Sequence, residues 1–173
     1  AGGSRGTYTP DSTNQDVDGA VIYSSDDIEY DIAGEYMDLH GDADIEYTNV
    51  ALSAGFINME WNKNLLKATP MSNRDSTYGF LLPSMIEAEK DPLKGDSMIY
   101  NLETRQGKVI KGKTKAEDGY YHGEEIRNQD MDIFYAEDAA YTTCELEHPH
   151  FHFQMNRMKM INEDKVVARP IVL

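Results

Sequence analysis

One eight-residue pattern recurs five times along this chain and restricts its fold more than any other feature. The pattern is an apolar residue, any residue, a small residue, any two residues, an apolar residue, any residue and usually another apolar residue. Its copies span residues 23–30, 52–59, 93–100, 121–128 and 153–160. Side chains on a strand alternate between the two faces of a sheet, so residues two apart share a face. The three-residue step after the small position therefore predicts an extra residue, a bulge, inside each strand.

Two copies depart from the pattern at one position each. Met155 replaces the small residue in the last copy, and the fourth copy ends on the polar Asn128. Repeated β units with a bend at a fixed point predict a stacked or rolled sheet with one long apolar interior. That interior is either a packed core or a groove for an apolar ligand.

Length and charge exclude several classes of protein. The chain has 173 residues, which suits one domain with a sizeable core. Its 31 acidic and 16 basic residues give a net charge of −15, so we expect no binding to nucleic acid, which requires a basic face. No long segment shows helical periodicity, and the predicted fold class is all-β.

The chain divides into three predicted parts. Residues 1–18 are rich in Gly, Ser, Thr and Asp and are expected to form a linker or disordered arm. Residues 19–163 form the β domain, and residues 164–173 are expected to lead into a further segment. Within the domain, alternation from Met37 to Tyr47 predicts a strand with an acidic outer face. Residues 69–92 are expected to form a long loop with a helical turn around Met85–Glu89.

The phase of the pattern predicts which side chains face the interior. Methionine is flexible and polarizable, and it suits surfaces that adapt to varied ligands. An interior rich in Met and Ile is ordinary core filling, or else it suits acyl chains. The predicted groove residues are Ile28, Tyr30, Ile57, Met59, Met98, Tyr100, Ile126, Met158 and Met160.

Three alternating histidines form the first candidate polar site. His148, His150 and His152 would point the same way on a strand, as metal-binding histidines of cupin-type barrels do. A cupin-like metal or sugar-binding jelly roll is therefore one alternative. The other is a solvated strand face opposite Phe151 and Phe153, which we favour, and we expect no metal and no cofactor.

A basic run stands out on this acidic chain. It consists of Arg105, Lys108, Lys111, Lys113 and Lys115. Its ammonium groups could bind an anionic headgroup. Alternatively, the lysines protect an edge strand from pairing with other molecules. The edge-strand interpretation is the simpler one.

Nothing in the sequence indicates catalysis. Ser76 lacks a G-x-S-x-G context, and Cys144 lacks a glycine-rich frame. We therefore expect a protein that is not an enzyme. Cys144 is the only cysteine, so it is either free and buried or paired with a segment outside this chain.

Several short runs resemble a known family. The succession Tyr141–Cys144 (YTTC), His148–His150 (HPH) and Met158–Met160 (MKM) looks like the end of the periplasmic domain of the lipopolysaccharide-assembly proteins, the LptD/OstA family. The unit Ala54–Met59 resembles the repeat of that family, and the HPH variant is most similar to Bacteroidetes-type members. The resemblance covers nearly the whole chain from Gly19.

The resemblance implies a fold, a function and partners. The fold would be an OstA-type open β-jellyroll, V-shaped and built from stacked antiparallel strands. Lipopolysaccharide acyl chains would travel in its apolar groove, at the periplasmic face of the outer membrane, toward a C-terminal transmembrane β-barrel. An outer-membrane lipoprotein would be a partner, and Cys144 would form a disulfide with a segment outside this chain. An open sheet edge would let a like-folded bridge protein add a strand. A soluble periplasmic bridge protein of the same fold is the nearest alternative.

Overall fold

The computed structural model describes residues 3–8, 19–71, 81–88, 90–116, 119–130, 133–146, 149–161 and 165–172. These residues form one antiparallel sheet and a single 3-10 turn, η1 (Trp61–Lys63). The strands are β1 (Ser4–Tyr8), β2 (Val21–Ser25), β3 (Asp27–Asp31), β4 (Tyr36–Tyr47), β5 (Val50–Glu60), β6 (Leu65–Thr69), β7 (Ser84–Glu87), β8 (Leu93–Lys94), β9 (Ser97–Asn101), β10 (Gly107–Ala116), β11 (Gly119–Asp130), β12 (Ile133–Thr142), β13 (Phe153–Ile161) and β14 (Lys165–Val172). Within this part of the chain, no helix is long and apolar enough to cross a membrane.

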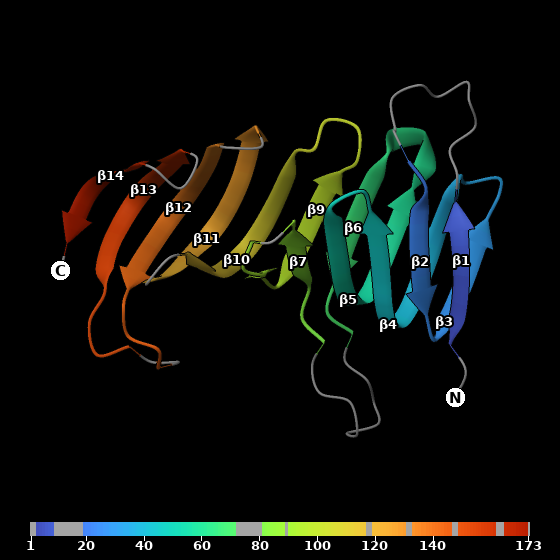
Figure 1. Ribbon diagram of the computed structural model, residues 1–173, viewed down its shortest axis with the longest axis horizontal. Coiled ribbons are helices and arrows are strands. Elements are labelled where there is room, and N and C mark those ends of the chain that lie inside the picture. Colours follow the sequence, from blue (N-terminus) through green and yellow to red (C-terminus); the bar gives the residue numbers. More distant parts are fainter. Residues whose placement is uncertain are drawn as a thin grey trace.

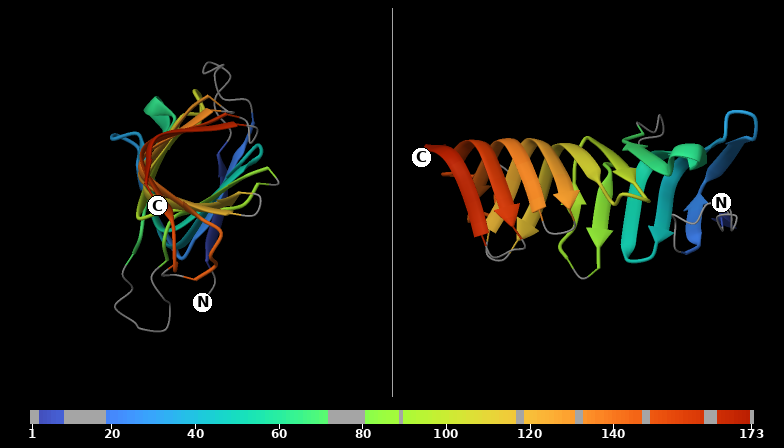
Figure 2. Two further views of the ribbon diagram at one scale, coloured as in Figure 1. Left: turned by 90° about the vertical axis from the view of Figure 1, so that its left-hand side faces the viewer. Right: turned by 90° about the horizontal axis from the view of Figure 1, so that it is seen from above.

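The long strands each serve two walls of the sheet. One half of β4 pairs with β2 and the other half with β3, while β5 divides its pairing between β6 and β7. In the same way β10 pairs with β9 and with β8. We call the wall with β3, β6 and β9 wall A, and the wall with β1, β2, β7 and β8 wall B. The strands follow one another along the long axis of the molecule (Figure 1), and seen from the C-terminal end they curl around a common interior (Figure 2).

The bend between the two walls lies at residues with left-handed backbone. In β4, a bulge shifts the pairing register between His40 and Ala43, and Gly41 and Asp42 have φ of 72° and 44°. Lys111 in β10 and Asp138 in β12 have φ of 48° and 46°, and neither pairs in the ladder. Left-handed backbone turns a strand sharply, so these positions fold the sheet along one line. The bend lies at the level that the pattern predicts, but not as a bulge inside each copy. The left-handed residues and the one register-shifting bulge at this line are in β4, β10 and β12, which contain no copy of the pattern.

Glycine at position 41 suits the left-handed backbone there and the close approach of Asp26. A Cβ atom there would lie 2.7 Å from a carboxylate oxygen of Asp26. The amide of Asp26 also donates a hydrogen bond to the carbonyl oxygen of Gly41 at 2.9 Å. This bond ties the junction of β2 and β3 to the bend in β4.

The core fills the N-terminal half of the molecule. Met37, Leu39 and Ile57 are 0% exposed, and Met59 and Leu66 are 1% exposed. Residues opposite one another, such as Met37 and Met59, share the inner face of the walls. Burying each of these side chains contributes about 1.5–3 kcal/mol to folding. The predicted strand from Met37 to Tyr47 is confirmed as β4, with its acidic residues on the outer face.

Three segments differ from their predicted structure. Ser4–Tyr8, inside the expected arm, pairs with β2 as β1, and residues 9–18 lie outside the described residues. Lys165–Val172, expected to lead onward, pairs with β13 as β14. Within the expected loop, Ser84–Glu87 is the strand β7 where a helical turn was predicted, because it completes wall B beside β5.

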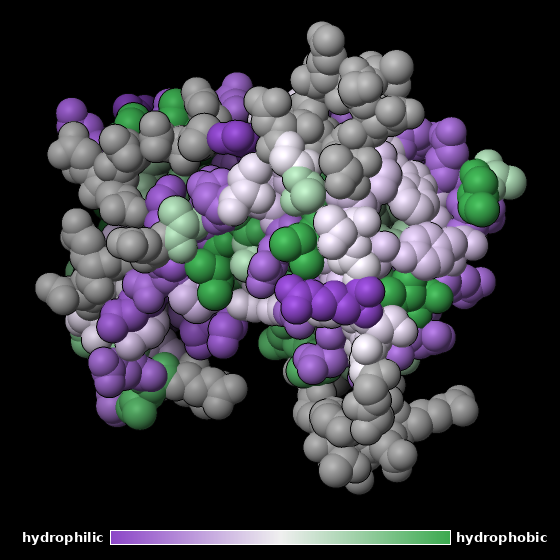
Figure 3. Space-filling model, turned by 45° about the vertical axis from the view of Figure 1, so that its right-hand side comes forward, coloured by the Kyte–Doolittle hydropathy of each residue, from purple (hydrophilic) through white to green (hydrophobic). Residues whose placement is uncertain are grey.

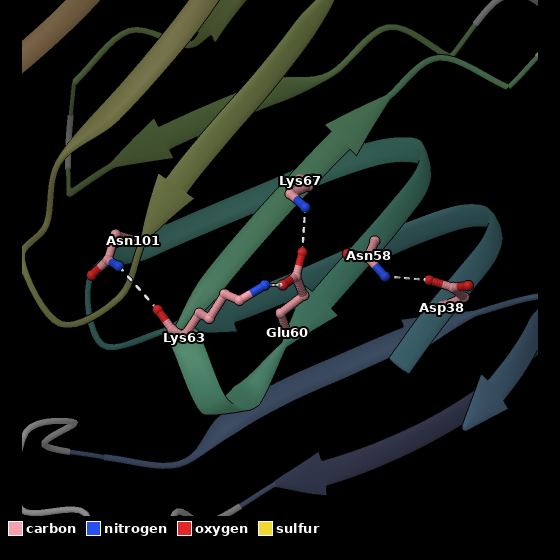
Figure 4. Close-up of polar contacts among 6 residues, drawn as sticks. All are labelled: Asp38, Asn58, Glu60, Lys63, Lys67 and Asn101. Atoms are coloured by element: carbon pink, nitrogen blue, oxygen red, sulfur yellow. Dashed lines mark hydrogen bonds and ion pairs between the residues drawn. The ribbon is translucent and has the colours of Figure 1, made fainter. Parts of the chain in front are cut away.

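The outer face of β4–β6 is held by polar contacts (Figure 4). Asn58 donates a hydrogen bond to Asp38 at 2.6 Å, and Asn101 donates one to the carbonyl oxygen of Lys63 at 3.1 Å. Glu60 forms ion pairs with both Lys63 and Lys67. Hydrogen bonds from Lys63 and then Lys67 lower the pKa of the Glu60 carboxyl. On the face shown in Figure 3, hydrophobic side chains occur as small separate spots among hydrophilic ones.

The left-handed residue in β12 gives a first prediction. Asp138→Gly should raise the free energy of unfolding by roughly 0.5–1 kcal/mol, because glycine adopts this backbone without strain. Asp138→Val should lower it by roughly 1–2 kcal/mol. Chemical denaturation measures both. Glu137→Gly, on the neighbouring extended residue, is the matched control and should destabilise; equal destabilisation by Asp138→Gly would contradict the bend.

The ion pairs of Glu60 give a second prediction. A lowered carboxyl pKa stabilises the fold above the ordinary value of 4.5, and this contribution disappears as pH falls through the lowered value. Glu60→Gln should therefore lower the free energy of unfolding by roughly 0.5–1 kcal/mol at pH 7 and by nothing in acid. Denaturant titrations across this pH range measure the difference. Glu46→Gln, whose carboxylate has no ion pair among the described residues, should not reproduce this dependence.

Candidate functional site

A cavity of about 680 Å³ opens in the interior of the C-terminal half. We call it the C-terminal trough. The β7–β8 segment forms one side of it, and β11, β12 and β13 form the other. Its apolar lining consists of Met85, Ala88, Leu93, Tyr121, Ile126, Phe134, Ala136, Met158 and Met160. Its polar lining consists of Glu87, Lys90, Asp91, Thr114 and Lys115.

Small residues alternate with large ones across the strands that line the trough. Ala136 is directly opposite both Ile126 and Met158, and Ala168 of β14 is opposite Met158. An alanine between two long side chains leaves space that a larger residue would fill. In the N-terminal half, Ala68 likewise lies between Ile57 and Met98, but all three residues are buried in the core, so an alanine alone does not produce the cavity.

Exposure of the inner face increases toward β14. Ile126 and Met158 in the trough are 7% and 6% exposed. Further along, Phe153 is 37%, Val166 45% and Ile171 59% exposed. Val166 and Ile171 lie opposite Met160 and Met155, so they continue the same inner face. The interior is therefore closed in the N-terminal half and open in the C-terminal half.

Aromatic side chains join the two walls at the N-terminal end. The hydroxyl of Tyr23 on β2 lies 2.6 Å from that of Tyr30 on β3. Burial, followed by this hydrogen bond, raises the pKa of Tyr23 to about 12. The ring of Tyr30 stacks on Trp61 at 6.1 Å, and the ring of Tyr8 meets Trp61 edge-on at 5.3 Å. These contacts close the interior between β1 and β3. The indole N–H of Trp61 is buried and has no hydrogen-bond partner among the described residues.

A lysine crosses from the β7–β8 turn to the opposite wall of the trough. The ammonium group of Lys90 lies 5.8 Å from the ring centroid of Phe134 and 3.7 Å from the carboxylate of Glu87. The charge of Glu87 also acts on Tyr100, whose pKa is raised to about 12, chiefly by burial. Glu87 and Lys90 therefore mark the boundary between the closed and open parts of the interior.

The nine predicted groove residues do not come together in one cavity. Ile126, Met158 and Met160 line the trough. Four others, Ile57, Met59, Met98 and Tyr100, are buried in the core. Ile28 packs against the core at the N-terminal end, where Tyr30 is 49% exposed.

Sequence reasoning missed half of the trough. Met85 and Leu93 lie in or beside the segment interpreted as a loop, although Leu93 opens one copy of the pattern. Phe134 was not singled out, yet its two-residue spacing from Ala136 places it on the same face. Tyr121 also begins a copy of the pattern, and that position was a usable signal.

The histidines form no metal centre in the described part of the chain. No group of three or more His, Cys, Asp or Glu residues comes together there. His148 lies outside the described residues, and His152 is exposed. The Sγ atom of Cys144 lies 3.6 Å from Nδ1 of His150, and hydrogen bonding around the loop lowers the pKa of this free thiol.

The edge-strand interpretation of the basic run is wrong. Its lysines lie on β10, which pairs with β8 and β9 on one side and β11 on the other. Two of them are neutralised, because Lys108 lies 2.6 Å from Glu125 and Lys111 lies 3.1 Å from Asp96.

Comparison with known proteins identifies the architecture. No protein-family model matches the chain, and no curated protein matches its sequence. Among solved structures, it is similar to the crystal structure of LptH from Pseudomonas aeruginosa, described as the LptA-homologous periplasmic component of the conserved lipopolysaccharide transport device. The match covers 70% of this chain and 85% of that chain, with a TM-score of 0.56 and 16% identity. The two proteins share a fold. The predicted all-β, OstA-type jellyroll is confirmed.

Proposed function

We propose that this protein is a non-enzymatic carrier that holds lipopolysaccharide acyl chains in the C-terminal trough as part of a periplasmic transport bridge. The observation that carries the proposal is an apolar cavity, open toward one end, inside the fold shared with a lipopolysaccharide transport component. This role requires binding and no catalysis. The methionine and aromatic side chains of the lining supply adaptable apolar contacts for it.

The size of the trough matches part of a lipid A molecule. An apolar cavity of about 150 Å³ holds the six carbons of a benzene ring, so 680 Å³ has room for roughly two dozen carbons. That is about two acyl chains. Burial of one chain of about a dozen carbons, at ~0.8 kcal/mol per methylene, supplies roughly 10 kcal/mol. The contacts are non-directional, which allows the chain to slide.

Two strands with a free edge support the proposal that a like-folded partner binds by strand addition. Among the described residues, β3 pairs only with β4 and β14 only with β13. The outward side chains of β3 are Asp27, Glu29 and Asp31, and those of β14 include Lys165 and Arg169. Strand addition between β14 of one molecule and β3 of another would align opposite charges outside and apolar residues inside.

We also propose a location and partners for this domain. The resemblance to the LptD/OstA family in residues 141–160 would place the domain at the periplasmic face of the outer membrane, before a C-terminal β-barrel and beside a lipoprotein partner. A disulfide from Cys144 to a segment outside this chain stays a prediction. A soluble bridge protein without a barrel is the second candidate, favoured by the match over 85% of LptH.

Native mass spectrometry with added lipopolysaccharide tests the carrier function. The wild type should form a stoichiometric adduct, and Met160→Glu should weaken it at least about tenfold, because a charge in the trough must be desolvated. Met160 is half-buried, so this variant should still fold.

Ile99→Glu is the matched control for that experiment. Ile99 is 42% exposed on the outer face, opposite Lys67 and Lys108. The control should bind like the wild type. An unliganded mass for the wild type, or an adduct that survives Met160→Glu, would contradict a carrier trough.

A further inference from the structure

A row of cationic side chains lies on the outer face of wall B, on the other side of the sheet from the trough. Lys94 of β8 is directly opposite Lys113 of β10, and Lys113 is directly opposite His122 of β11. Directly opposite residues share a face, with Cβ atoms roughly 5 Å apart. Gly112 and Gly123, their neighbours in the chain, face Ile126 on the inner side, and Lys113 is exposed, so Lys113 and its partners point outward.

A hollow adjoins this row at the C-terminal side. It has a volume of about 500 Å³ and is lined by Pro149, His150, Phe151, His152, Gln154 and Val172. Gln154 and His122 are both opposite Ala140 of β12, whose small side chain leaves the surface between them low. The hydroxyl of Thr142 donates a 2.7 Å hydrogen bond to the carbonyl oxygen of Phe151, which fixes the loop that forms the hollow.

The charges of this row are not neutralised by the protein. Neither Lys94 nor Lys113 has an ion-pair partner among the described residues, although the chain carries a net charge of −15. Lys111 nearby is paired with Asp96, and Lys115 lies over the ring of Tyr120. Like charges placed directly opposite each other destabilise a sheet. An arrangement of this kind is stabilised by an anion bound between the cations.

The electrostatics of His122 show that the groups act on one another. Burial lowers the pKa of this imidazole, and the charges of Lys113 and then His152 lower it further. His152 lines the hollow together with Gln154, which lies across Ala140 from His122, so it completes the cluster. Glu124 and Asp138, at the bend, are the acidic side chains nearest in sequence on β11 and β12.

We propose that Lys94, Lys113, His122 and His152 form a binding site for the phosphate group of a phosphate monoester. Lysine ammonium groups act as point charges for phosphate, and a phosphate monoester carries close to two negative charges at neutral pH. The imidazoles and the amide of Gln154 supply directional hydrogen-bond donors beside the two lysines. The hollow gives room for the group esterified to the phosphate. Because it lies outside wall B, this site can be occupied whether or not the trough holds a lipid.

Phosphate binding at this site should be coupled to protonation. A bound anion beside His122 counteracts Lys113 and His152, so it raises the pKa of the imidazole. Binding of the phosphate dianion therefore takes up a proton at His122. The phosphate itself gains its second proton at about pH 6, which works against tighter binding at lower pH. Removing the charge of Lys113 should change the pKa of His122 in the same direction. Lys113→Met should therefore raise this pKa without any ligand.

Histidine side-chain NMR of the full chain tests the proposal. Inorganic phosphate and glucose 1-phosphate are titrated separately at constant ionic strength maintained with chloride. Saturable shifts at His122 and His152, with a raised pKa of His122, are expected in both titrations. Tighter binding of glucose 1-phosphate would identify a sugar phosphate as the ligand, and equal binding a site that recognises phosphate alone.

Variants separate a site from general attraction of anions. Lys94→Met and Lys113→Met should each weaken binding by roughly fivefold. Lys165→Met removes the same charge from exposed β14 and should leave binding unchanged. Shifts that fail to saturate, or that respond equally to all three variants, would overturn the proposal. The trough carries none of these residues, so this outcome would leave the carrier function untouched.

Discussion

The bend across the sheet is the constraint on which the rest of this structure depends. Each long strand must turn at the same level, because only then do its two halves face one interior. Gly41, Asp42, Lys111 and Asp138 provide this turn through left-handed backbone. After the bend, the side chains resume their alternation in a phase that keeps apolar residues inside, as Ala54 and Ile57 show. Without the bend, the apolar face would lie on a flat sheet open to water.

The interior differs between the two ends of the same sheet. Opposed pairs such as Met37 and Met59 fill the N-terminal half, and the contacts among Tyr8, Tyr23, Tyr30 and Trp61 close its end. Farther along, Ile126, Ala136 and Met158 line the trough, and exposure of the inner face rises toward β14. One fold thus contains both a solid core and an open cavity. The outer face carries charge, acidic near β3 and basic near β14, which suits association between sheet edges.

The sequence predicted the fold class, the bend and the inner face from one repeated pattern. Those properties are local, since they depend only on the alternation of side chains along each strand. Which inner positions stay open is not local. Ile57 and Ile126 occupy the same place in the pattern, and each has an alanine opposite it on one side, Ala68 and Ala136. Yet Ile57 is 0% exposed in the core and Ile126 lines the trough. The pairing of β8 with β10 was also inaccessible, because it joins residues on either side of β9. The approach of His152 to Lys113 and His122 depends on the register of β10 through β13.

Fluorescence quenching by a brominated acyl chain tests the division of the interior most directly. Trp61 is the only tryptophan, and it lies at the closed end. The double variant Trp61→Phe, Phe134→Trp moves the reporter into the trough. Bromododecanoic acid, which quenches indole only at close range, should quench the double variant with saturation and leave wild-type Trp61 unaffected. Equal quenching of both proteins would show that the acyl chain passes through the N-terminal half, and quenching of neither would show that the trough binds no acyl chain.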